Sequence, residues 1–400
     1  MLFNSIINPA DRGGCGHYRC LFPSWAIQSM RKDIKISDYS YLSPAKEIFL
    51  GQRLVRVQRQ VSDYQAEYFL KMLIPMSKSI GFWLAYEIDD VIHRDHIPRY
   101  NPAWATFQND RLMNNIQTIL NNVDFLTVTT EILGNYYNKY FNVSKEKILV
   151  IPNFLPLWWI GENYSLDRMN KQYDEHTKKR IGFISSASHI DIRNQNNGND
   201  DFTHIIPFIE QNIEKYDFVF VGTYPRQLKK YLEDKKISFY PGFDVLNYPR
   251  LTNNLNLDLI IAPLQDNIFN AAKSNLKAIE PSSMGIPVVL QDNKCYETCP
   301  MPKFNNCNDL QNEVDRILGS KDVFLDEIKR NRDFVDNDTT HDNHGWWLEH
   351  NIYKWINFYT LSQKTIHVNL ENIKLSNKVF EVDKNIPEVK NEFEEVRIDV

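Results

Sequence analysis

Short apolar segments alternate with amphipathic segments along the first 155 residues. Runs rich in branched and aromatic residues predict buried strands, and the stretches between them carry apolar residues at helical spacing. The predicted strands are residues 2 to 7, 54 to 58, 81 to 88, 124 to 129 and 148 to 153, and the predicted helices are residues 17 to 32, 62 to 73, 102 to 120 and 130 to 141. This alternation predicts a mostly parallel, doubly wound sheet.

The same pattern restarts after a polar stretch in the middle of the chain. The second set of predicted strands is residues 180 to 185, 216 to 222, 237 to 242, 257 to 264 and 286 to 291, with helices at 205 to 214, 225 to 234, 248 to 254 and 275 to 283. We therefore predict an α/β protein with two Rossmann-like domains, residues 1 to 155 and 156 to 340. An aromatic helix within residues 345 to 362 is expected to complete the first domain, and residues 363 to 400 form a charged extension.

Composition narrows the class of protein. A chain of 400 residues with 42% hydrophobic content can bury a large core. Its formal net charge of -5 gives no overall nucleic-acid footprint, so any such contact must come from a local basic face. The longest apolar run, residues 148 to 161, contains two prolines and is too short to span a bilayer. Five cysteines and an N-terminus without a leader pattern predict the reducing cytoplasm.

The first predicted strand ends in a glycine-rich turn, NPADRGGCGH. Gly13, Gly14 and Gly16 allow a ligand to approach the backbone, and the helix that begins near His17 offers free amide groups to an anion. The turn matches neither the dinucleotide-binding fingerprint nor a Walker loop. An anion site and a purely structural turn are both open interpretations of these residues alone.

Acidic and imidazole side chains crowd the segment YEIDDVIHRDHIP after the third predicted strand. Asp89 and Asp90 are the leading acidic candidates, followed by His93 and His96. The segment could bind a metal, hydrogen-bond a hydroxyl acceptor without one, or form a solvated loop. Arg59 stands at the carboxyl end of the preceding strand, where its side chain is expected to point into the same cleft.

A lysine-rich segment, KSNLKAIEPSSMGIPVVLQD, precedes the last predicted strand. On a helix, Lys273, Lys277 and Glu280 share one face. The lysines can meet a diphosphate while Glu280 accepts hydrogen bonds from two ribose hydroxyls, although a solvated Lys/Glu face has the same spacing. At the end of the predicted strand at residues 180 to 185 lie the polar residues Ser185, Ser186 and His189. They could bind a phosphate or a sugar, or they could form an ordinary turn, and the sequence favours neither interpretation.

The segment KSNLKAIEPSSMGIPVV resembles the donor-binding segment of retaining, family-four-like glycosyltransferases of the GT-B fold, whose usual form is Glu-Ala-x-Ala-x-Gly-x-Pro-Val. Further matches follow in the family's order: the glycine-rich turn, IPNF, FVFVG and LDLIIAPL. Two features depart from the family pattern. The first glutamate of the usual pair falls at Ala272, and SSASHID replaces the usual diphosphate-gripping residues.

The resemblance implies two domains facing a cleft, and transfer of a sugar from a nucleotide-diphosphate donor, expected to be a UDP-sugar, to a hydroxyl acceptor. It implies retention of configuration, no tightly bound cofactor and no metal. The catalytic residues implied are Asp89, Asp90 and Lys273. The donor-binding residues implied are Gly13, Gly14, Ser185, Ser186, His189, Lys273, Lys277 and Glu280. The acceptor-binding residues implied are Gly16, His17, Arg19, Arg59, His93 and His96.

GGCGHYRC and YEIDD also resemble glycosyltransferases of tailed bacteriophages, some of which glycosylate 5-hydroxymethylcytosine in DNA. That resemblance implies a double-stranded DNA acceptor with a flipped base, and the cytoplasm of a bacterial host cell as the location. It needs a local basic groove, with Arg53, Arg56, Arg94 and Arg99 as candidates. The alternatives are surface-polysaccharide or glycolipid synthesis, a nucleotide-sugar epimerase, and a non-catalytic nucleotide- or sugar-binding module. A monomer or weak dimer is expected.

Overall fold

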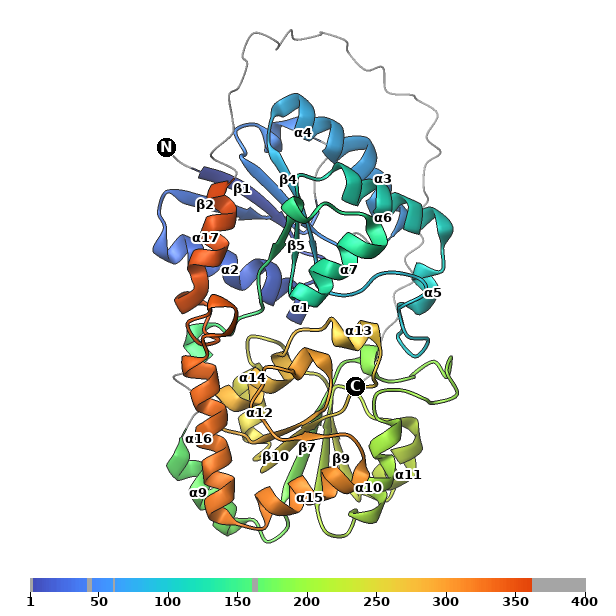
Figure 1. Ribbon diagram of the computed structural model, residues 1–400, viewed down its shortest axis with the longest axis vertical. Coiled ribbons are helices and arrows are strands. Elements are labelled where there is room, and N and C mark those ends of the chain that lie inside the picture. Colours follow the sequence, from blue (N-terminus) through green and yellow to red (C-terminus); the bar gives the residue numbers. More distant parts are fainter. Residues whose placement is uncertain (1–2, 42–44, 60–61, 160–164, 362–400) are drawn as a thin grey trace, which may run out of the picture. The chain divides into compact units, whose positions relative to one another are not determined.

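Two parallel six-stranded sheets form the framework of the protein (Figure 1). The computed structural model describes residues 3 to 41, 45 to 59, 62 to 159 and 165 to 361. The strand order is β2-β1-β3-β4-β5-β6 in the first sheet and β12-β11-β10-β7-β8-β9 in the second. Both sheets belong to one compact unit. The predicted fold class, α/β with two Rossmann-like domains, is confirmed.

The first sheet and its helices come from the N-terminal half of the chain. Its strands are β1 (Phe3–Asn8), β2 (Ile34–Asp38), β3 (Leu54–Gln58), β4 (Trp83–Ile88), β5 (Phe125–Val128) and β6 (Ile148–Val150). Its α-helices are α1 (Gly14–Gly16), α2 (Phe22–Met30), α3 (Asp63–Tyr68), α4 (Ile74–Ile80), α5 (Trp104–Phe107), α6 (Asp110–Asn122) and α7 (Glu131–Phe141). Two π-helical turns, η1 (His17–Leu21) and η3 (Phe69–Leu73), join α1 to α2 and α3 to α4; the 3-10 turns are η2 (Lys46–Phe49), η4 (Lys145–Lys147) and η5 (Leu157–Trp159).

The second sheet and its helices come from the C-terminal half. Its strands are β7 (Arg180–Ile184), β8 (Asp217–Val221), β9 (Ile237–Tyr240), β10 (Leu259–Ala262), β11 (Val288–Gln291) and β12 (Lys303–Phe304). Its helices are α9 (Leu166–Glu175), α10 (Ile206–Gln211), α11 (Lys229–Glu233), α12 (Tyr248–Asn254), α13 (Ile268–Ala271), α14 (Leu276–Ser283), α15 (Cys307–Leu318) and α16 (Lys321–Asn337). The last helix is α17 (Ile352–Leu361).

Both faces of the first sheet are covered, which explains its nearly continuous apolar strands. Successive residues of a strand point to opposite faces. Val55 and Leu84 accordingly pack in the core cluster on one face, whereas their neighbours Leu54 and Ala85 pack in the cluster on the other. All four side chains are fully buried. The sheet therefore holds the loops at its carboxyl edge on a rigid support.

Helix α17 is the last described element of the chain but packs on the N-terminal sheet. In Figure 1 it lies beside α2 and β1, and Tyr359 meets Phe3 of β1 edge-on with ring centroids 6.2 Å apart. The Arg56 guanidinium lies over the Trp355 ring, 4.5 Å from the ring centroid. The chain thus crosses between the two domains twice. The two crossing segments pair through Leu155, whose amide donates to Trp346 O at 2.9 Å.

The structure departs from the predicted elements at several places. Strands β2 and β12 were not predicted, because β2 carries only two buried apolar residues and β12 is two residues long. The predicted helix at 102 to 120 is two helices, since the Asn109 side chain accepts from Leu112 N and starts α6 afresh. The aromatic helix predicted within residues 345 to 362 begins only at Ile352.

Candidate functional site

A cavity of about 360 Å³ lies where the carboxyl ends of strands from both domains meet. Open parallel sheets bind ligands at this edge. The predicted site residues that line it are Gly14, Asp89, Asp90, Ser185, Ser186, His189, Lys273, Lys277 and Glu280. Residues that the sequence did not single out also line it, among them Cys15, Tyr18, Asn153, Tyr248 and Tyr296.

Lys273 joins the two walls of the cavity. Its Nζ lies 3.2 Å from Oδ1 of Asp90, and its ammonium group lies over the Phe269 ring, 4.3 Å from the centroid. Although burial alone would lower the pKa of Lys273, Asp90 and Asp201 hold it above its ordinary value. The expectation of a helical Lys273 is corrected, because this residue lies in the turn between α13 and α14. The turn brings its ammonium group to the N-terminal wall as a permanent cation.

Lys277 and Glu280 lie on α14 and line the C-terminal wall. Burial lowers the pKa of Lys277 to about 8, and the charge of Lys273 adds to this shift. Burial raises the pKa of Glu280 to about 7. Helix α14 stops before Gly285, whose φ of 75° turns the chain into β11. The Gly-Ile-Pro of the sequence therefore ends the helix and leaves these two side chains at the cavity.

Two tyrosine hydroxyls approach the Glu280 carboxylate. Tyr18 on η1 donates to Oε1 at 2.6 Å, and Tyr248 on α12 also hydrogen-bonds the carboxyl group. Because these bonds stabilise the ionised form, they act against the upward shift of the Glu280 pKa. Neither tyrosine could be singled out from sequence patterns, because Tyr18 reaches Glu280 only where the two domains meet.

The N-terminal wall carries two carboxylates that differ in their surroundings. Arg59 Nη1 lies 3.2 Å from Asp89 Oδ1 and 3.8 Å from Asp90 Oδ2, while its Nη2 lies 3.3 Å from Asp11 Oδ2. The Asp89 side chain is 7% exposed and that of Asp90 is 24% exposed. Asp90 is therefore the carboxylate more open to a ligand. Arg59 contacts both carboxylates and holds them in position.

The glycine-rich turn binds a carboxylate of its own chain. Asp11 Oδ1 accepts from Gly13 N at 2.8 Å and from Gly16 N at 3.1 Å. A Cβ on Gly16 would lie 1.9 Å from Asp11 O, so this position requires glycine. Neither Gly13 nor Gly16 lines the cavity, and the expectation of free amides for an anion is corrected at these two residues. Gly14 does line it.

Two expected acceptor-binding residues are used inside the N-terminal domain. Arg19 is completely buried, and its guanidinium donates to Glu87, at 2.7 Å from Nε to Oε1, and to the backbone oxygen of Ile151 at 2.5 Å. His17 is buried too, with Nδ1 at 2.8 Å from Gly13 O. The expectation that they contact an acceptor is corrected, because neither lines the cavity.

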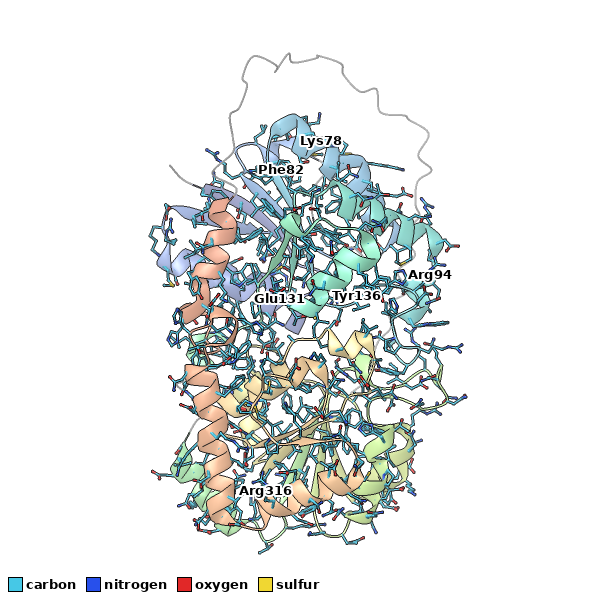
Figure 2. The ribbon with its side chains drawn as sticks, viewed as in Figure 1. Lys78, Phe82, Arg94, Glu131, Tyr136 and Arg316 are labelled. Atoms are coloured by element: carbon cyan, nitrogen blue, oxygen red, sulfur yellow. The ribbon has the colours of Figure 1, made fainter. Side chains whose placement is uncertain are left out.

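His93 and His96 form part of an aromatic cluster outside the cavity lining. Their ring centroids lie 5.1 Å apart, and His96 Nδ1 lies 2.6 Å from the hydroxyl of Tyr136 on α7, which Figure 2 labels. Burial lowers the pKa of His93. The two histidines follow Asp89 and Asp90 in the same loop, and the contact with Tyr136 packs this loop against α7.

The arginines considered for a basic groove differ in their exposure. Arg56 is completely buried beside Glu87, with its guanidinium over Trp355. Arg94, which Figure 2 labels at the edge of the N-terminal half, pairs with Asp110. The Arg99 guanidinium lies over the Trp104 ring, 5.1 Å from its centroid. Burial corrects the expectation of a DNA-facing side chain for Arg56, whereas Arg99 is exposed and Arg94 is partly exposed.

His189 belongs to a buried network that links the domains. Its Nδ1 lies 2.7 Å from Asp201 Oδ2, and Tyr100, from the N-terminal domain, donates to Asp201 Oδ1 at 2.8 Å. Asn270 Nδ2 donates to the same oxygen at 2.7 Å. Burial lowers the pKa of His189 to about 4, so the imidazole is neutral at physiological pH. With Nδ1 donating to Asp201, Nε2 is left as an acceptor.

Two further properties concern the described part of the chain. Within residues 3 to 361, apart from the gaps stated above, no three His, Cys, Asp or Glu side chains are grouped so that they could hold a metal ion. The helices described in that same part include none with the length and apolar character needed to cross a bilayer.

The fold is that of the GT-B glycosyltransferases. A glycosyltransferase from Rickettsia africae ESF-5 superposes with a TM-score of 0.56 at 13% identity, covering 91% of this chain and 100% of its own. Anabaena Alr3699/HepE in complex with UDP and glucose gives a TM-score of 0.57 at 10% identity, again covering 91% and 100%.

A third solved structure with this fold is an alpha-glucosyltransferase in complex with UDP-glucose and DNA containing an abasic site. Its TM-score is 0.56 at 10% identity, covering 90% of this chain and 99% of that one. Neither a protein-family model nor a curated protein sequence matches the chain. At these identities the likeness establishes the fold, and function must be argued from the cavity.

Proposed function

We propose that this protein is a glycosyltransferase that moves a sugar from a UDP-sugar to a hydroxyl acceptor. One observation carries the proposal: Lys273, Lys277 and Glu280 line one wall of an interdomain cavity whose other wall presents Asp90. Two cations and a carboxylate on one wall suit a diphosphate and a ribose, respectively. The GT-B fold supports this, and so do fold neighbours whose complexes contain UDP or UDP-glucose.

In the proposed complex, Lys273 and Lys277 bind the donor diphosphate, and Glu280 accepts hydrogen bonds from the ribose hydroxyls. Ser185, Ser186 and His189 contribute polar contacts from the turns after β7. His189 acts there as a neutral hydrogen-bonding group, because its pKa is about 4. The diphosphate charge is thus met by the two lysines, in a cavity where burial strengthens their effect.

The proposed reaction breaks the bond between the sugar anomeric carbon and the diphosphate oxygen, and forms a bond from that carbon to the acceptor oxygen. The bonding electron pair leaves with the diphosphate, and Lys273 and Lys277 stabilise the negative charge that grows there. The acceptor hydroxyl gives its proton to the departing diphosphate on the same face. This front-face course retains the anomeric configuration and requires no protein nucleophile.

Asp90 is the residue proposed to orient the acceptor hydroxyl. It is more exposed than Asp89, and it already contacts Lys273 at 3.2 Å, so an acceptor held by Asp90 would lie close to the departing diphosphate. Asp89 is the better shielded partner of Arg59 and is proposed to fix the position of the wall. Close placement of the reacting atoms supplies much of the rate in such transfers.

For the acceptor we propose the hydroxymethyl group of a modified cytosine in DNA. Support comes from the fold neighbour bound to UDP-glucose and DNA, together with the phage-like GGCGHYRC and YEIDD segments. Because Arg56 is buried, DNA would be held by side chains other than this one. A base extruded from the duplex would have to enter the cavity to meet Asp90.

The test is a transfer assay with UDP-sugars and hydroxymethylcytosine DNA, unmodified DNA or no acceptor, with the products read by mass spectrometry. A sugar mass on the modified cytosine supports both reaction and acceptor. UDP release with no DNA product would contradict the DNA acceptor and direct the search to glycans and lipids. Conversion of the sugar without any acceptor would indicate an epimerase, and an intact UDP-sugar in every mixture would contradict a transferase.

A further inference from the structure

Tyr18 places a hydroxyl from one domain on the ribose-binding carboxylate of the other. It lies on η1, next to the glycine-rich turn, and donates to Glu280 Oε1 at 2.6 Å. Both residues line the cavity, and Tyr18 is only 5% exposed. This distance lies in the usual range for a hydroxyl that donates to a carboxylate.

The Tyr18 ring is held by packing that does not involve its hydroxyl. It meets Phe22 edge-on with centroids 5.6 Å apart and Trp159 with centroids 6.3 Å apart. Trp159 in turn packs against Tyr248 at 5.8 Å. The rings therefore form one cluster around Glu280, drawn from both domains and from the segment that joins them. Removing the Tyr18 hydroxyl alone would leave this packing in place.

The two tyrosine hydroxyls make the same kind of contact that two ribose hydroxyls would make. A carboxylate that recognises a ribose accepts hydrogen bonds from neighbouring hydroxyl groups. In the ligand-free chain Tyr18 and Tyr248 supply such groups to Glu280. A donor nucleotide must then exchange one hydroxyl for another, so part of the hydrogen-bond energy that it gains is offset by the bond that it breaks.

We propose that the Tyr18 hydroxyl stands in for a ribose hydroxyl on Glu280, and that it lowers the affinity for the donor nucleotide by competing for this carboxylate. The inference rests on the proposed function, since it takes Glu280 as the ribose contact. Tyr18 is thus a positioning residue. It keeps Glu280 satisfied in the empty cavity and releases it when a nucleotide enters, which also breaks a contact between the domains.

The test compares UDP with 2′,3′-dideoxy-UDP by calorimetry on the wild-type chain and on Tyr18→Phe. The measurements are made at about pH 8, above the Glu280 pKa of about 7, because the loss of the Tyr18 bond raises that pKa and a lower pH would favour the protonated carboxyl group in the variant. We expect Tyr18→Phe to bind UDP roughly three- to tenfold more tightly. We expect its affinity for the dideoxy nucleotide, which cannot engage Glu280, to match that of the wild type.

The matched control is Tyr216→Phe. Tyr216 is a buried tyrosine whose hydroxyl also donates to a carboxylate, at 2.9 Å to Asp315 Oδ1, but it does not line the cavity. UDP affinity should not change in this variant. Tyr18→Leu also lacks the hydroxyl and carries the same expectation if Tyr18→Phe is not obtained as folded protein.

The outcomes separate this inference from the proposed function. If the wild type binds UDP and the loss of the Tyr18 hydroxyl leaves UDP affinity unchanged or weaker, competition by Tyr18 is overturned while the proposed function stands. If the variant bound UDP and the dideoxy nucleotide more tightly by the same factor, competition by Tyr18 would be overturned as well, because the gain in affinity would not depend on ribose hydroxyls. If the wild type does not bind UDP at all, the proposed function fails and this inference fails with it.

Discussion

Lys273 Nζ lies 3.2 Å from Asp90 Oδ1, so a lysine of the C-terminal domain pairs with an aspartate of the N-terminal domain across the cavity. Each partner has a separate role in the proposed reaction, one with the diphosphate and the other with the acceptor. The pair holds both groups in place before either ligand arrives, and a bound diphosphate would compete with Asp90 for the ammonium group.

Replacing Lys273 by alanine should weaken UDP binding by about tenfold or more, since a charge-assisted contact to the diphosphate is lost. Calorimetry with UDP measures the change directly. Lys294→Ala is the control, because Lys294 is a lysine of the same domain that pairs with Glu297 and has a 57% exposed side chain. Wild-type UDP affinity in Lys273→Ala would contradict its assignment to the diphosphate.

UDP affinity should be greatest between about pH 7 and about pH 8. As the pH falls through the Glu280 pKa of about 7, the carboxyl group takes up a proton and no longer accepts two hydroxyls. As the pH rises through the Lys277 pKa of about 8, the ammonium loses its charge. A titration from about pH 6 to about pH 9 would show both limbs.

Variants separate the two limbs of that profile. Glu280→Gln should bind UDP more weakly and lose the acidic limb, because glutamine does not titrate. Lys277→Arg should lose the basic limb, because arginine keeps its charge throughout this range. A profile in which both limbs survive both substitutions would mean that other groups control the pH dependence.

Replacing Asp90 by asparagine should lower the turnover number by roughly a hundredfold, because the acceptor hydroxyl loses its orienting carboxylate. UDP affinity should be kept or rise slightly, since Lys273 is freed from its partner. Initial rates and calorimetry on the same variant distinguish the two effects. Asp95→Asn, five residues further along the loop at a side chain 70% exposed, should turn over normally.

The glycine-rich turn allows a stability test with a neighbouring control. Gly16→Ala should lower the free energy of unfolding by roughly 1 to 3 kcal/mol, because its Cβ would overlap Asp11 O and the backbone would have to shift. Gly14→Ala should change it by less than about 0.5 kcal/mol, because nothing lies within 4 Å of the Cβ position. Denaturant unfolding measures both, and equal losses would contradict the structural role of Gly16.

Much of the framework could be predicted because it depends on local pattern. Strands β3 and β11 lie where apolar runs placed them, and Lys277 and Glu280 share a face because three residues span nearly one helical turn. Their place at the strand ends follows from the general rule for parallel sheets. These features need only residues that are near one another in sequence.

The remaining features depend on partners from distant segments. Arginine is usually a surface residue, yet Arg19 and Arg56 are both buried against Glu87 and Trp355. Tyr18 becomes a site residue only where the domains meet. Spacing along the chain reports none of these contacts, so sequence patterns assigned the arginines outward and overlooked the tyrosine.

The position of α17 has a consequence for how the protein is made. The N-terminal sheet leaves the ribosome first, yet the Trp355 ring that covers Arg56 is synthesised hundreds of residues later. The elements from α9 to α16 are continuous in sequence. Domains generally fold during synthesis in order from the N-terminus. Here we expect the C-terminal domain to reach its final structure first, because the N-terminal domain is complete only after α17 has been synthesised and has packed on its sheet.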